Sequence, residues 1–247
     1  QEFSTDLLRV YYGRLFPYDA LFNWLSYGTQ AGSESDSNDF FSRREWSFTI
    51  EDDIYIRYQS FKDKNELIAA IQKRQPHKID IGAIFTGCPK DHNTIKPELF
   101  TTVERELVFD IDMTDYDDIR TCCTGASICH RCWPYMTMAV KVIDKALRDD
   151  FGFKHILWIY SGRRGVHCWV CDPAAREMSN DARGAVVNYL TIHTGSTENS
   201  DKKLKQSFEN PHPMVRRAYD ILEPYFAKCI VDEAGQGLLA RKDRYMK

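Results

Sequence analysis

The chain has 247 residues, a formal net charge of −3 and a hydrophobic fraction of 43%. Its length predicts one α/β domain with an appendage or two small domains. The slightly acidic balance excludes a uniformly basic nucleic-acid coat, although local arginine pairs can still bind phosphate. Because the sequence has no run of 18 apolar residues and no signal-peptide pattern, we expect a soluble intracellular protein. The first residue is not methionine, which indicates a trimmed or recombinant fragment.

The first half of the chain predicts helices and aromatic-rich strands. Residues 5–16 carry apolar side chains at helical spacing, and Pro17 ends the pattern. Residues 28–39 are rich in small and polar side chains, which is typical of a mobile loop. Three β-branched and aromatic segments and one helical segment follow. They are strands over 46–50 and 54–61, joined as a hairpin by 51–53, a helix over 65–74 and a strand over 78–85.

The second half also alternates strands and helices. In chain order these are a strand ending at Asp112, a helix over 134–150, strands over 156–160 and 166–171, and a helix over 179–190 that Ser179 caps. Residues 194–213 turn polar and indicate a linker, and 214–231 resume helical spacing interrupted by Pro224. The pattern predicts a mixed α/β (α+β) fold. We expect one domain over 1–193, followed by a linker and part of a helical subdomain over 194–247.

Two carboxylates, Asp110 and Asp112, stand at the end of an apolar strand. Side chains alternate along a strand, so both aspartates point to one face while Leu107, Phe109 and Ile111 face the core. At about 3.3 Å rise per residue their backbones are roughly 6.5–7 Å apart, which lets both reach one pair of metal ions. Unpaired carboxylates at the end of a buried strand repel each other, so a cation is expected to offset them. Oxygen ligands suit Mg²⁺ or Mn²⁺ best.

Three other interpretations of this segment compete with a metal pair. An acidic surface turn is one, since three more aspartates follow, but it does not explain the apolar strand that comes first. A calcium loop requires Gly at its sixth position and Glu at its twelfth, where this chain has Asp115 and Thr121. The third is the first motif of haloacid-dehalogenase-type phosphatases, which Asp-Ile-Asp-Met-Thr resembles. There Asp110 would be the nucleophile and Asp112 the general acid, but we find no later acidic pair of the kind those enzymes need.

Four cysteines lie within eleven residues: Cys122, Cys123, Cys129 and Cys132. In an intracellular protein such density favours a metal site over a disulfide framework. Thiolates bind Zn²⁺ tetrahedrally at about 2.3 Å, and the small residues between Cys123 and Cys129 allow the sulfurs to converge. Buried free cysteines clustered by chance are the alternative. Because all four ligands are thiolates, no position stays open for catalysis, and we expect a structural zinc site.

A second Cys-x-x-Cys pair, Cys168 and Cys171, lies within a predicted strand. Residues three apart on a strand face opposite sides, so these two sulfurs cannot converge without a bulge. We expect both cysteines to pack in the core.

The segment Ser161-Gly-Arg-Arg-Gly-Val-His167 joins two apolar strands. Guanidinium groups match phosphate oxygens bidentately, and glycines let backbone amides approach a polyanion. The segment lacks the Gly-x4-Gly-Lys-Ser/Thr pattern of a Walker loop. A solvated basic hairpin tip is the simpler alternative. Together with the Asp-x-Asp strand, however, the segment favours a nucleoside triphosphate site.

Four segments in this order, residues 55–61, 109–118, the four cysteines and 161–170, resemble the small catalytic subunit of eukaryotic DNA primases, in the archaeo-eukaryotic primase superfamily. The resemblance extends from Tyr11 to about Leu190. It implies an α/β fold with a central mixed β-sheet flanked by helices and a small zinc-binding insertion at 122–132. It also implies an enzyme that makes short RNA primers from NTPs on single-stranded DNA by two-metal nucleotidyl transfer.

The resemblance further implies roles for individual residues. Asp110 and Asp112 are expected to be catalytic and to hold Mg²⁺ or Mn²⁺, and the four cysteines to hold structural Zn²⁺. The residues expected to bind the nucleotide are Ser161, Arg163, Arg164, His167, Arg57, Lys78 and Glu45. Without the resemblance, Arg57 is a solvated strand residue, and Lys78 and Glu45 have no assignment.

The implied partners are a DNA template, an RNA primer, the large primase subunit and the DNA polymerase α complex, all in the nucleus. The family completes its carboxylate set with a third aspartate on a later apolar strand. Asp232 lacks that setting, so we expect the chain to be truncated at its C-terminal side and to have little polymerase activity by itself. The phosphatase and a non-enzymatic zinc-stabilised nucleic-acid-binding or scaffold module are the alternatives.

Overall fold

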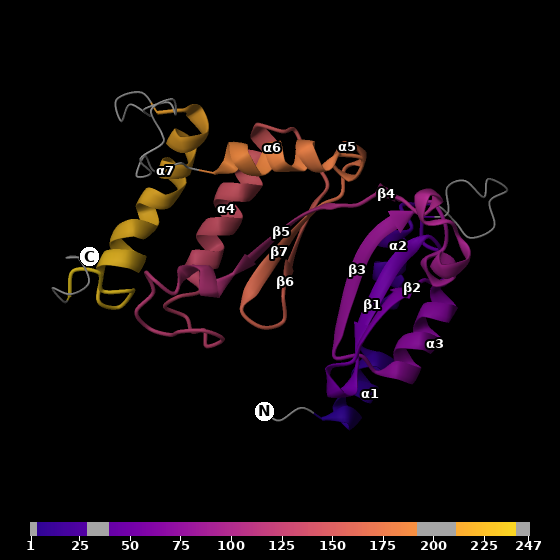
Figure 1. Ribbon diagram of the computed structural model, residues 1–247. Coiled ribbons are helices and arrows are strands. Elements are labelled where there is room, and N and C mark those ends of the chain that lie inside the picture. Colours follow the sequence, from indigo (N-terminus) through magenta and orange to yellow (C-terminus); the bar gives the residue numbers. More distant parts are fainter. Residues whose placement is uncertain (1–3, 29–39, 192–210, 241–247) are drawn as a thin grey trace. The chain divides into compact units, whose positions relative to one another are not determined.

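The computed structural model describes residues 4–28, 40–191 and 211–240 (Figure 1). The chain forms two compact units, Gln1–Arg105 and Glu106–Lys247, and each has its own sheet. The predicted mixed α/β class is confirmed. The described strands form two antiparallel sheets, however, and not one central mixed sheet. Short hairpins connect two of the five neighbouring pairs, β1–β2 and β6–β7, and such connections produce antiparallel pairs.

The N-terminal unit packs helices against a four-stranded sheet. In chain order its elements are α1 (Thr5–Arg14), α2 (Tyr18–Leu25), β1 (Arg44–Thr49), η2 (Glu51–Asp53), β2 (Tyr55–Gln59), α3 (Lys64–Arg74), β3 (Lys78–Phe85), η3 (Pro89–Thr94), η4 (Pro97–Leu99) and β4 (Thr102–Glu104). The strand order is β2-β1-β3-β4. Trp46 and Phe48 of β1 are buried in one core with Leu67 and Ile71 of α3, because alternate strand residues and helical i, i+4 residues each share a face.

The helix α2 was not predicted. Pro17 ends the apolar spacing of α1, but it also occupies the N-cap position of α2. Proline is tolerated at the start of a helix, where its missing N–H leaves no bond unmade. Pro17 therefore separates two helices.

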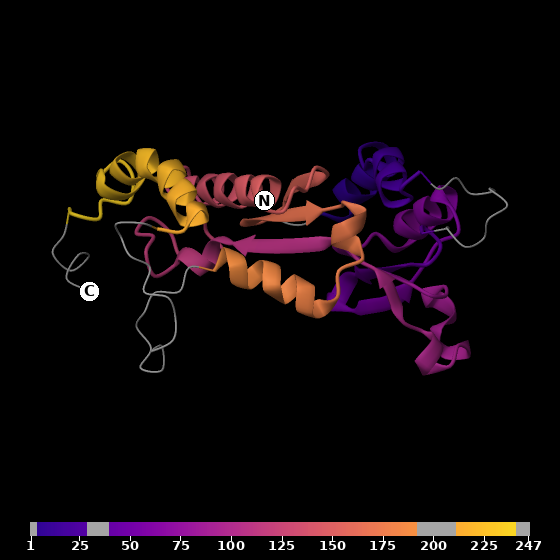
Figure 2. The ribbon, with the colours of Figure 1, turned by 90° about the horizontal axis from the view of Figure 1, so that it is seen from above.

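The C-terminal unit holds the three-stranded sheet, in the order β5-β7-β6. Its elements are β5 (Leu107–Asp112), η5 (Met113–Tyr116), α4 (Pro134–Asp149), β6 (Ile156–Tyr160), β7 (Gly165–Val170), α5 (Pro173–Arg176), α6 (Asn180–Leu190), α7 (Pro213–Tyr225) and the π-helical turn η6 (Phe226–Val231). Seen from above, α4 and α6 lie on either side of the strands (Figure 2). The Ser179 side chain accepts a hydrogen bond from Ala182 N, which confirms the predicted cap of α6.

The pairing of β5 with β7 brings two distant parts of the sequence together. Asp110 lies opposite His167, and Asp112 lies opposite Gly165. Glycine is required at this position, because a Cβ on Gly165 would lie 2.4 Å from the backbone oxygen of Ile111. The end of β5 and the loop before β7 therefore lie side by side.

Two sequence predictions fall largely outside the described residues. One is the loop over 28–39, of which only residue 28 is described, and the other is the linker over 194–213, of which only 211–213 are described. The predicted domain boundary at residue 193 also lies outside them and stays a prediction.

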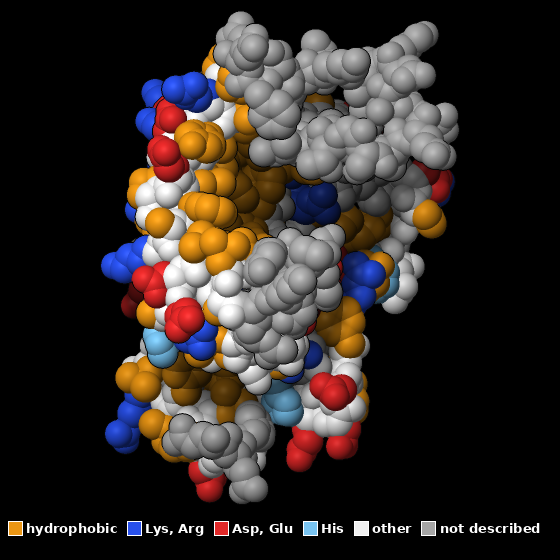
Figure 3. All heavy atoms as spheres, turned by 90° about the vertical axis from the view of Figure 1, so that its left-hand side faces the viewer, with side chains coloured by type: hydrophobic (Ala, Val, Ile, Leu, Met, Phe, Trp, Pro, Cys, Tyr) orange, Lys and Arg blue, Asp and Glu red, His pale blue; other side chains and the backbone are white. Residues whose placement is uncertain are grey.

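Three large apolar side chains on α7 and at the first residue of η6 are exposed. Tyr219, Leu222 and Phe226 follow one another at helical spacing and are exposed. Figure 3 looks onto the side of the molecule where α7 lies and shows hydrophobic side chains gathered there. None of the helices in the described part of the chain has the length and apolar composition that crossing a bilayer requires.

Candidate active site and metal centre

Asp110 and Asp112 project from the same face of β5. Leu107 and Ile111 on the other face are buried, as the alternation predicted. The Asp110 side chain is 73% exposed, and its Oδ1 lies 3.3 Å from Nε2 of His167 on the neighbouring strand. The Asp112 side chain is 33% exposed. The pair is thus accessible to an ion from solvent and is not a buried, self-repelling pair.

Asp112 is held in place by three donor groups. Nε of Arg164 donates to both carboxylate oxygens at 2.7 and 2.8 Å. The backbone N–H and the hydroxyl of Thr114 each donate to Oδ1 at 2.8 Å, which makes Asp112 the N-cap of η5. The Arg164 guanidinium, with the two Thr114 donors outweighing the effect of burial, lowers the pKa of Asp112 well below its usual range. Asp112 is therefore ionised and has a fixed orientation.

The loop over 161–165 is folded by its own backbone and one hydroxyl. Ser161 N donates to Gly165 O at 3.0 Å, and Gly165 N donates to the Ser161 hydroxyl at 2.9 Å. Gly162 has a φ of +85°, a conformation that favours glycine. Arg163 is exposed, and its backbone oxygen accepts a hydrogen bond from the Tyr160 hydroxyl at 2.8 Å. The loop therefore presents two guanidinium groups next to the end of β5.

Five of the predicted site residues form one group in the C-terminal unit: Asp110, Asp112, Ser161, Arg164 and His167. The group places carboxylates beside a hydroxyl, an imidazole and a guanidinium. Carboxylates bind cations, and the other three groups donate hydrogen bonds to phosphate oxygens. The arrangement can hold a divalent ion and a polyanion together.

Arg163 lies in the same loop as Ser161 and Arg164, and the remaining three predicted residues, Glu45, Arg57 and Lys78, belong to the N-terminal unit. Arg57 donates from Nε and a terminal nitrogen to the two oxygens of Glu45, at 3.1 and 3.3 Å. The Glu45 side chain is buried and also accepts a bond from Tyr58 N, whose φ is +56°. Glu45 therefore fixes the direction of the half-exposed Arg57 side chain. Lys78 is exposed at the first position of β3 and pairs in register with Thr49.

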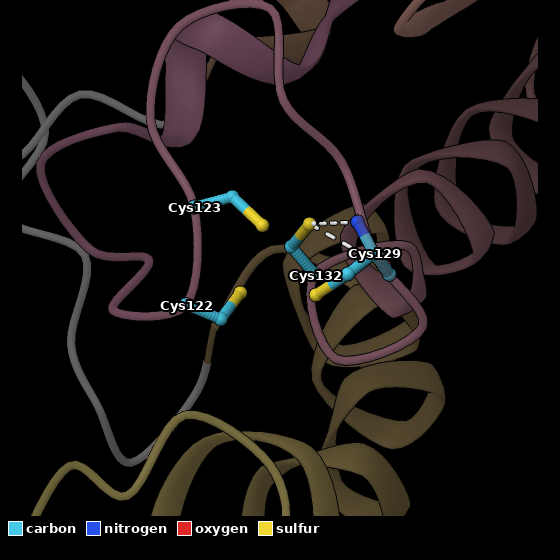
Figure 4. A group of neighbouring side chains, drawn as sticks. All are labelled: Cys122, Cys123, Cys129 and Cys132. Carbon is cyan, nitrogen blue, oxygen red and sulfur yellow. Dashed lines mark hydrogen bonds between the residues drawn. The ribbon is translucent and has the colours of Figure 1, made fainter.

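The four clustered cysteines point toward one another (Figure 4). Their sulfur atoms all lie within 4.8 Å of one another. Tetrahedral coordination with metal–sulfur bonds of about 2.3 Å places the sulfurs about 3.8 Å apart, so a small adjustment closes the group around an ion. The cluster fits a metal ion such as zinc.

Backbone donors support the Cys129–Cys132 half of the cluster. Cys129 N lies 3.2 Å from Cys132 Sγ. Burial alone would raise the pKa of the Cys129 thiol, but hydrogen bonds, first among them those from the backbone N–H groups of Arg131 and Cys132, lower it to about 6. A thiol that ionises near neutral pH is prepared to bind a metal.

Arg120 is a structural residue of this centre that sequence analysis did not identify. Its side chain is fully buried, and it donates to the carbonyl oxygens of Gly125 and Ser127 at 2.8 Å each. It also pairs with Asp117 and lies 3.8 Å from Cys132 Sγ. The i, i+3 spacing of Asp117 and Arg120 is a weak signal of this pair, but nothing local in the sequence predicts the contact with the sulfur.

Cys168 and Cys171 pack in the interior, as predicted. Both are buried, and Cys168 contacts the core between β7 and α4. Burial raises the pKa of Cys168 to about 12. In the described part of the chain, the group of four cysteines is the one cluster of three or more His, Cys, Asp or Glu side chains close enough to share a metal ion.

Comparison with known proteins identifies a family. The family model described as DNA primase small subunit matches residues 109–246. The chain is 49% identical over 233 residues to the DNA primase small subunit of Drosophila melanogaster, covering 94% of this chain and 52% of that protein. It is 41% identical over 230 residues to the protein of the same name in Schizosaccharomyces pombe, covering 93% of this chain and 49% of that protein.

The similarity extends to archaea. The DNA primase small subunit PriS of Methanothrix thermoacetophila is 31% identical over 155 residues, which covers 60% of this chain and 37% of that protein. The chain thus spans about half the length of the eukaryotic relatives it matches and a smaller share of this archaeal one.

Proposed function

Because the chain belongs to the DNA primase small subunit family, we propose that it carries the catalytic region of an enzyme that makes RNA primers on single-stranded DNA. The reaction is nucleotidyl transfer from NTPs. The observation that carries the proposal is the placement of Asp110 and Asp112 on one face of β5, beside the loop over 161–165.

In this proposal Asp110 and Asp112 are the catalytic residues and hold Mg²⁺ or Mn²⁺. The ions supply a lowered pKa for the primer 3′-hydroxyl and neutralisation of the triphosphate charge. Asp112 contributes a carboxylate that is already ionised and oriented, and Asp110 contributes an exposed one. Among the described residues, no third acidic side chain lies close enough to Asp110 and Asp112 to share an ion with them. Asp232 accepts a hydrogen bond from Ala234 N in a local turn. From the family resemblance, a third carboxylate completes this pair in the working enzyme.

The triphosphate is bound by Ser161, Arg163, Arg164 and His167. The bonds from Arg164 to Asp112 use Nε, and in this proposal the terminal amino groups of the same guanidinium bind phosphate oxygens. One guanidinium then links the metal ligand to the phosphate. From the family resemblance, Arg57, Lys78 and Glu45 take part in nucleotide binding, with Glu45 orienting Arg57.

Zinc is the metal we propose for the cysteine cluster. Four thiolates fill a tetrahedral shell, so the ion stabilises the fold and does not take part in the reaction. The proposed partners follow the family: a large primase subunit, the DNA polymerase α complex, a DNA template and an RNA primer, in the nucleus.

Nucleotide binding to the 247-residue chain tests the site. Binding of an NTP in the presence of Mn²⁺ should be lost in Asp110→Ala and in Arg163→Ala, because each removes a charge that contacts the metal or the phosphates. Asp118→Ala and Arg216→Ala are matched controls, since both residues are exposed and lie outside the group. Equal binding by Asp110→Ala and by the unchanged chain would contradict the assignment.

The whole protein provides a test of the reaction. It should incorporate ribonucleotides on a polypyrimidine DNA template with Mn²⁺ or Mg²⁺. Release of phosphate from a generic ester, without incorporation, would instead favour the phosphatase alternative. If the protein catalyses neither reaction, the remaining alternative is a non-enzymatic, zinc-stabilised binding module.

A further inference from the structure

The turn after η6, residues 232–238, lies against the loop that carries the four cysteines. We call this segment the C-terminal turn. At its centre Gln236 is buried, with 1% of its surface exposed, more than 100 residues away in sequence from its contacts. A buried carboxamide needs a hydrogen-bond partner for each of its polar atoms, because an unpaired polar group in the interior destabilises the fold.

The Gln236 side chain makes these hydrogen bonds with residues next to the four cysteines. Its Oε1 accepts a bond from Thr121 N at 2.7 Å, and its backbone oxygen accepts one from the Thr121 hydroxyl at 2.6 Å. Its Nε2 donates to Arg131 O at 2.7 Å and lies 3.6 Å from Cys122 Sγ. Thr121 precedes Cys122 and Cys123, and Arg131 precedes Cys132. One side chain therefore bridges the two halves of the ligand set.

Arg131 completes the connection in the opposite direction. Its Nε donates to Gly235 O at 2.6 Å and a terminal nitrogen donates to Glu233 O at 3.1 Å. The turn itself is tightly closed, because a Cβ on Gly235 would lie 2.4 Å from the backbone oxygen of Cys229. The backbone of the C-terminal turn is thus closely constrained, and in this conformation its carbonyl oxygens accept the hydrogen bonds from Arg131 in the cysteine loop.

We propose that Gln236 is a positioning residue of the metal centre, which makes metal binding and the docking of the C-terminal turn a single equilibrium. The inference rests on the proposed zinc site. Four thiolates around a divalent ion leave a net charge of −2, and N–H donors to the sulfurs disperse that charge. Gln236 supplies such a donor to Cys122, and it also fixes the separation of the two ligand pairs through Thr121 and Arg131.

Metal affinity is the direct test. The unchanged chain, Gln236→Ala and Gln236→Glu are loaded with zinc and titrated with a chromophoric chelator, and bound zinc is measured. Outer-shell residues typically contribute about 10–100-fold to metal affinity, so Gln236→Ala should bind zinc more weakly by that factor. Gln236→Glu keeps the acceptor for Thr121 but replaces the donor to Cys122, and it should also be weaker. Glu233→Ala is the control, because its exposed side chain lies in the same turn and should leave affinity unchanged.

Hydrogen exchange provides a second measurement that does not involve activity. Gln236 N is bonded to Cys229 O and Leu238 N to Ile230 O, each at 2.9 Å. Removing zinc from the unchanged chain should speed exchange at both amides, whereas amides of the N-terminal unit keep their rates. If Gln236 only filled space, removal of zinc would leave the exchange rates of these two amides unchanged.

The outcomes are distinct. Equal zinc affinity in Gln236→Ala and the unchanged chain overturns the inference and leaves the zinc site intact. An unchanged chain that holds no zinc overturns the zinc assignment, and the inference with it. If Gln236→Ala does not fold, Thr121→Val replaces it, because this variant removes only the hydroxyl bonds to the backbone oxygen and Oε1 of Gln236 and should still weaken zinc binding several-fold.

Discussion

Replacing Gly165 by alanine tests whether the close contact between β5, which carries Asp110 and Asp112, and β7, which follows the loop over 161–165, is required. A Cβ at this position would lie 2.4 Å from the Ile111 backbone oxygen, whereas ordinary contacts begin at 3.4 Å. The end of β7 must therefore move away from β5 by about 1 Å. The bond from Met113 N to Arg164 O, now 3.2 Å long, would then exceed hydrogen-bonding distance.

The expected loss has two parts. One or two backbone hydrogen bonds contribute about 1 kcal/mol each, and overpacking destabilises by about 1–3 kcal/mol. We therefore expect the free energy of unfolding to fall by about 2–5 kcal/mol. Mn²⁺-dependent NTP binding should weaken as well, because the contact between Arg164 and Asp112 crosses the same pair of strands.

Urea unfolding followed by circular dichroism measures the stability change, and NTP titration measures the site. Gly184→Ala is the matched control: no atom lies within 4 Å of its added Cβ, and it lies within α6. Alanine there should stabilise by about 0.5–1 kcal/mol, because it reduces the entropy of the unfolded chain. If the free energy of unfolding of Gly165→Ala lies within about 0.5 kcal/mol of that of the unchanged chain, the strands do not approach as closely as described and the reasoning fails.

Three other substitutions report on separate features. Burial disfavours the charge of Asp144, but the Arg148 guanidinium and the Trp158 N–H together more than offset it and lower the pKa of Asp144. The stability that this provides is complete above the ordinary pKa of about 3.9 and is lost as pH falls through the lower folded value, so Asp144→Asn should be about 1 kcal/mol less stable at pH 6 in urea titrations, and the difference should shrink as the pH is lowered below 3.9. Arg120→Met should destabilise by about 1–3 kcal/mol by the same assay, because it removes the donor to the carbonyl oxygens of Gly125 and Ser127 and to the Asp117 carboxylate, while exposed Arg216→Ala should change little. Cys132→Ser should lower zinc content and the midpoint of thermal unfolding, and added zinc should not restore either; an unchanged zinc content on elemental analysis would contradict the four-thiolate site.

Features encoded by neighbouring residues could be predicted from the sequence. The structure has β3 at the predicted bounds and α4 within one residue of them, because strand alternation and helical spacing are local signals. The cysteine cluster is equally local, since all four ligands lie within eleven residues. The expected facing of Asp110 and Asp112 is confirmed for the same reason.

Features that depend on distant pairing could not be predicted. The division of the strands into two antiparallel sheets depends on which strands meet, and strand alternation carries no such information. The contact between Arg164 and Asp112 joins residues 52 apart; the chemistry of the two motifs and the family resemblance connected them, but nothing in the sequence predicted that these two side chains bond. Gln236 gave no signal at all, because a single glutamine in a polar segment becomes informative only when its partners, 105 and 115 residues away, are known.

The ion pair between Arg164 and Asp112 cancels the charges of these two side chains before any ligand binds. A cation on Asp112 and an anion on Arg164 attract each other, and the bond between the two side chains holds their binding positions side by side. Each ligand therefore favours the binding of the other, and by thermodynamic linkage the two affinities rise together. In the proposed enzyme, metal ion and triphosphate would be captured jointly, with either alone held weakly.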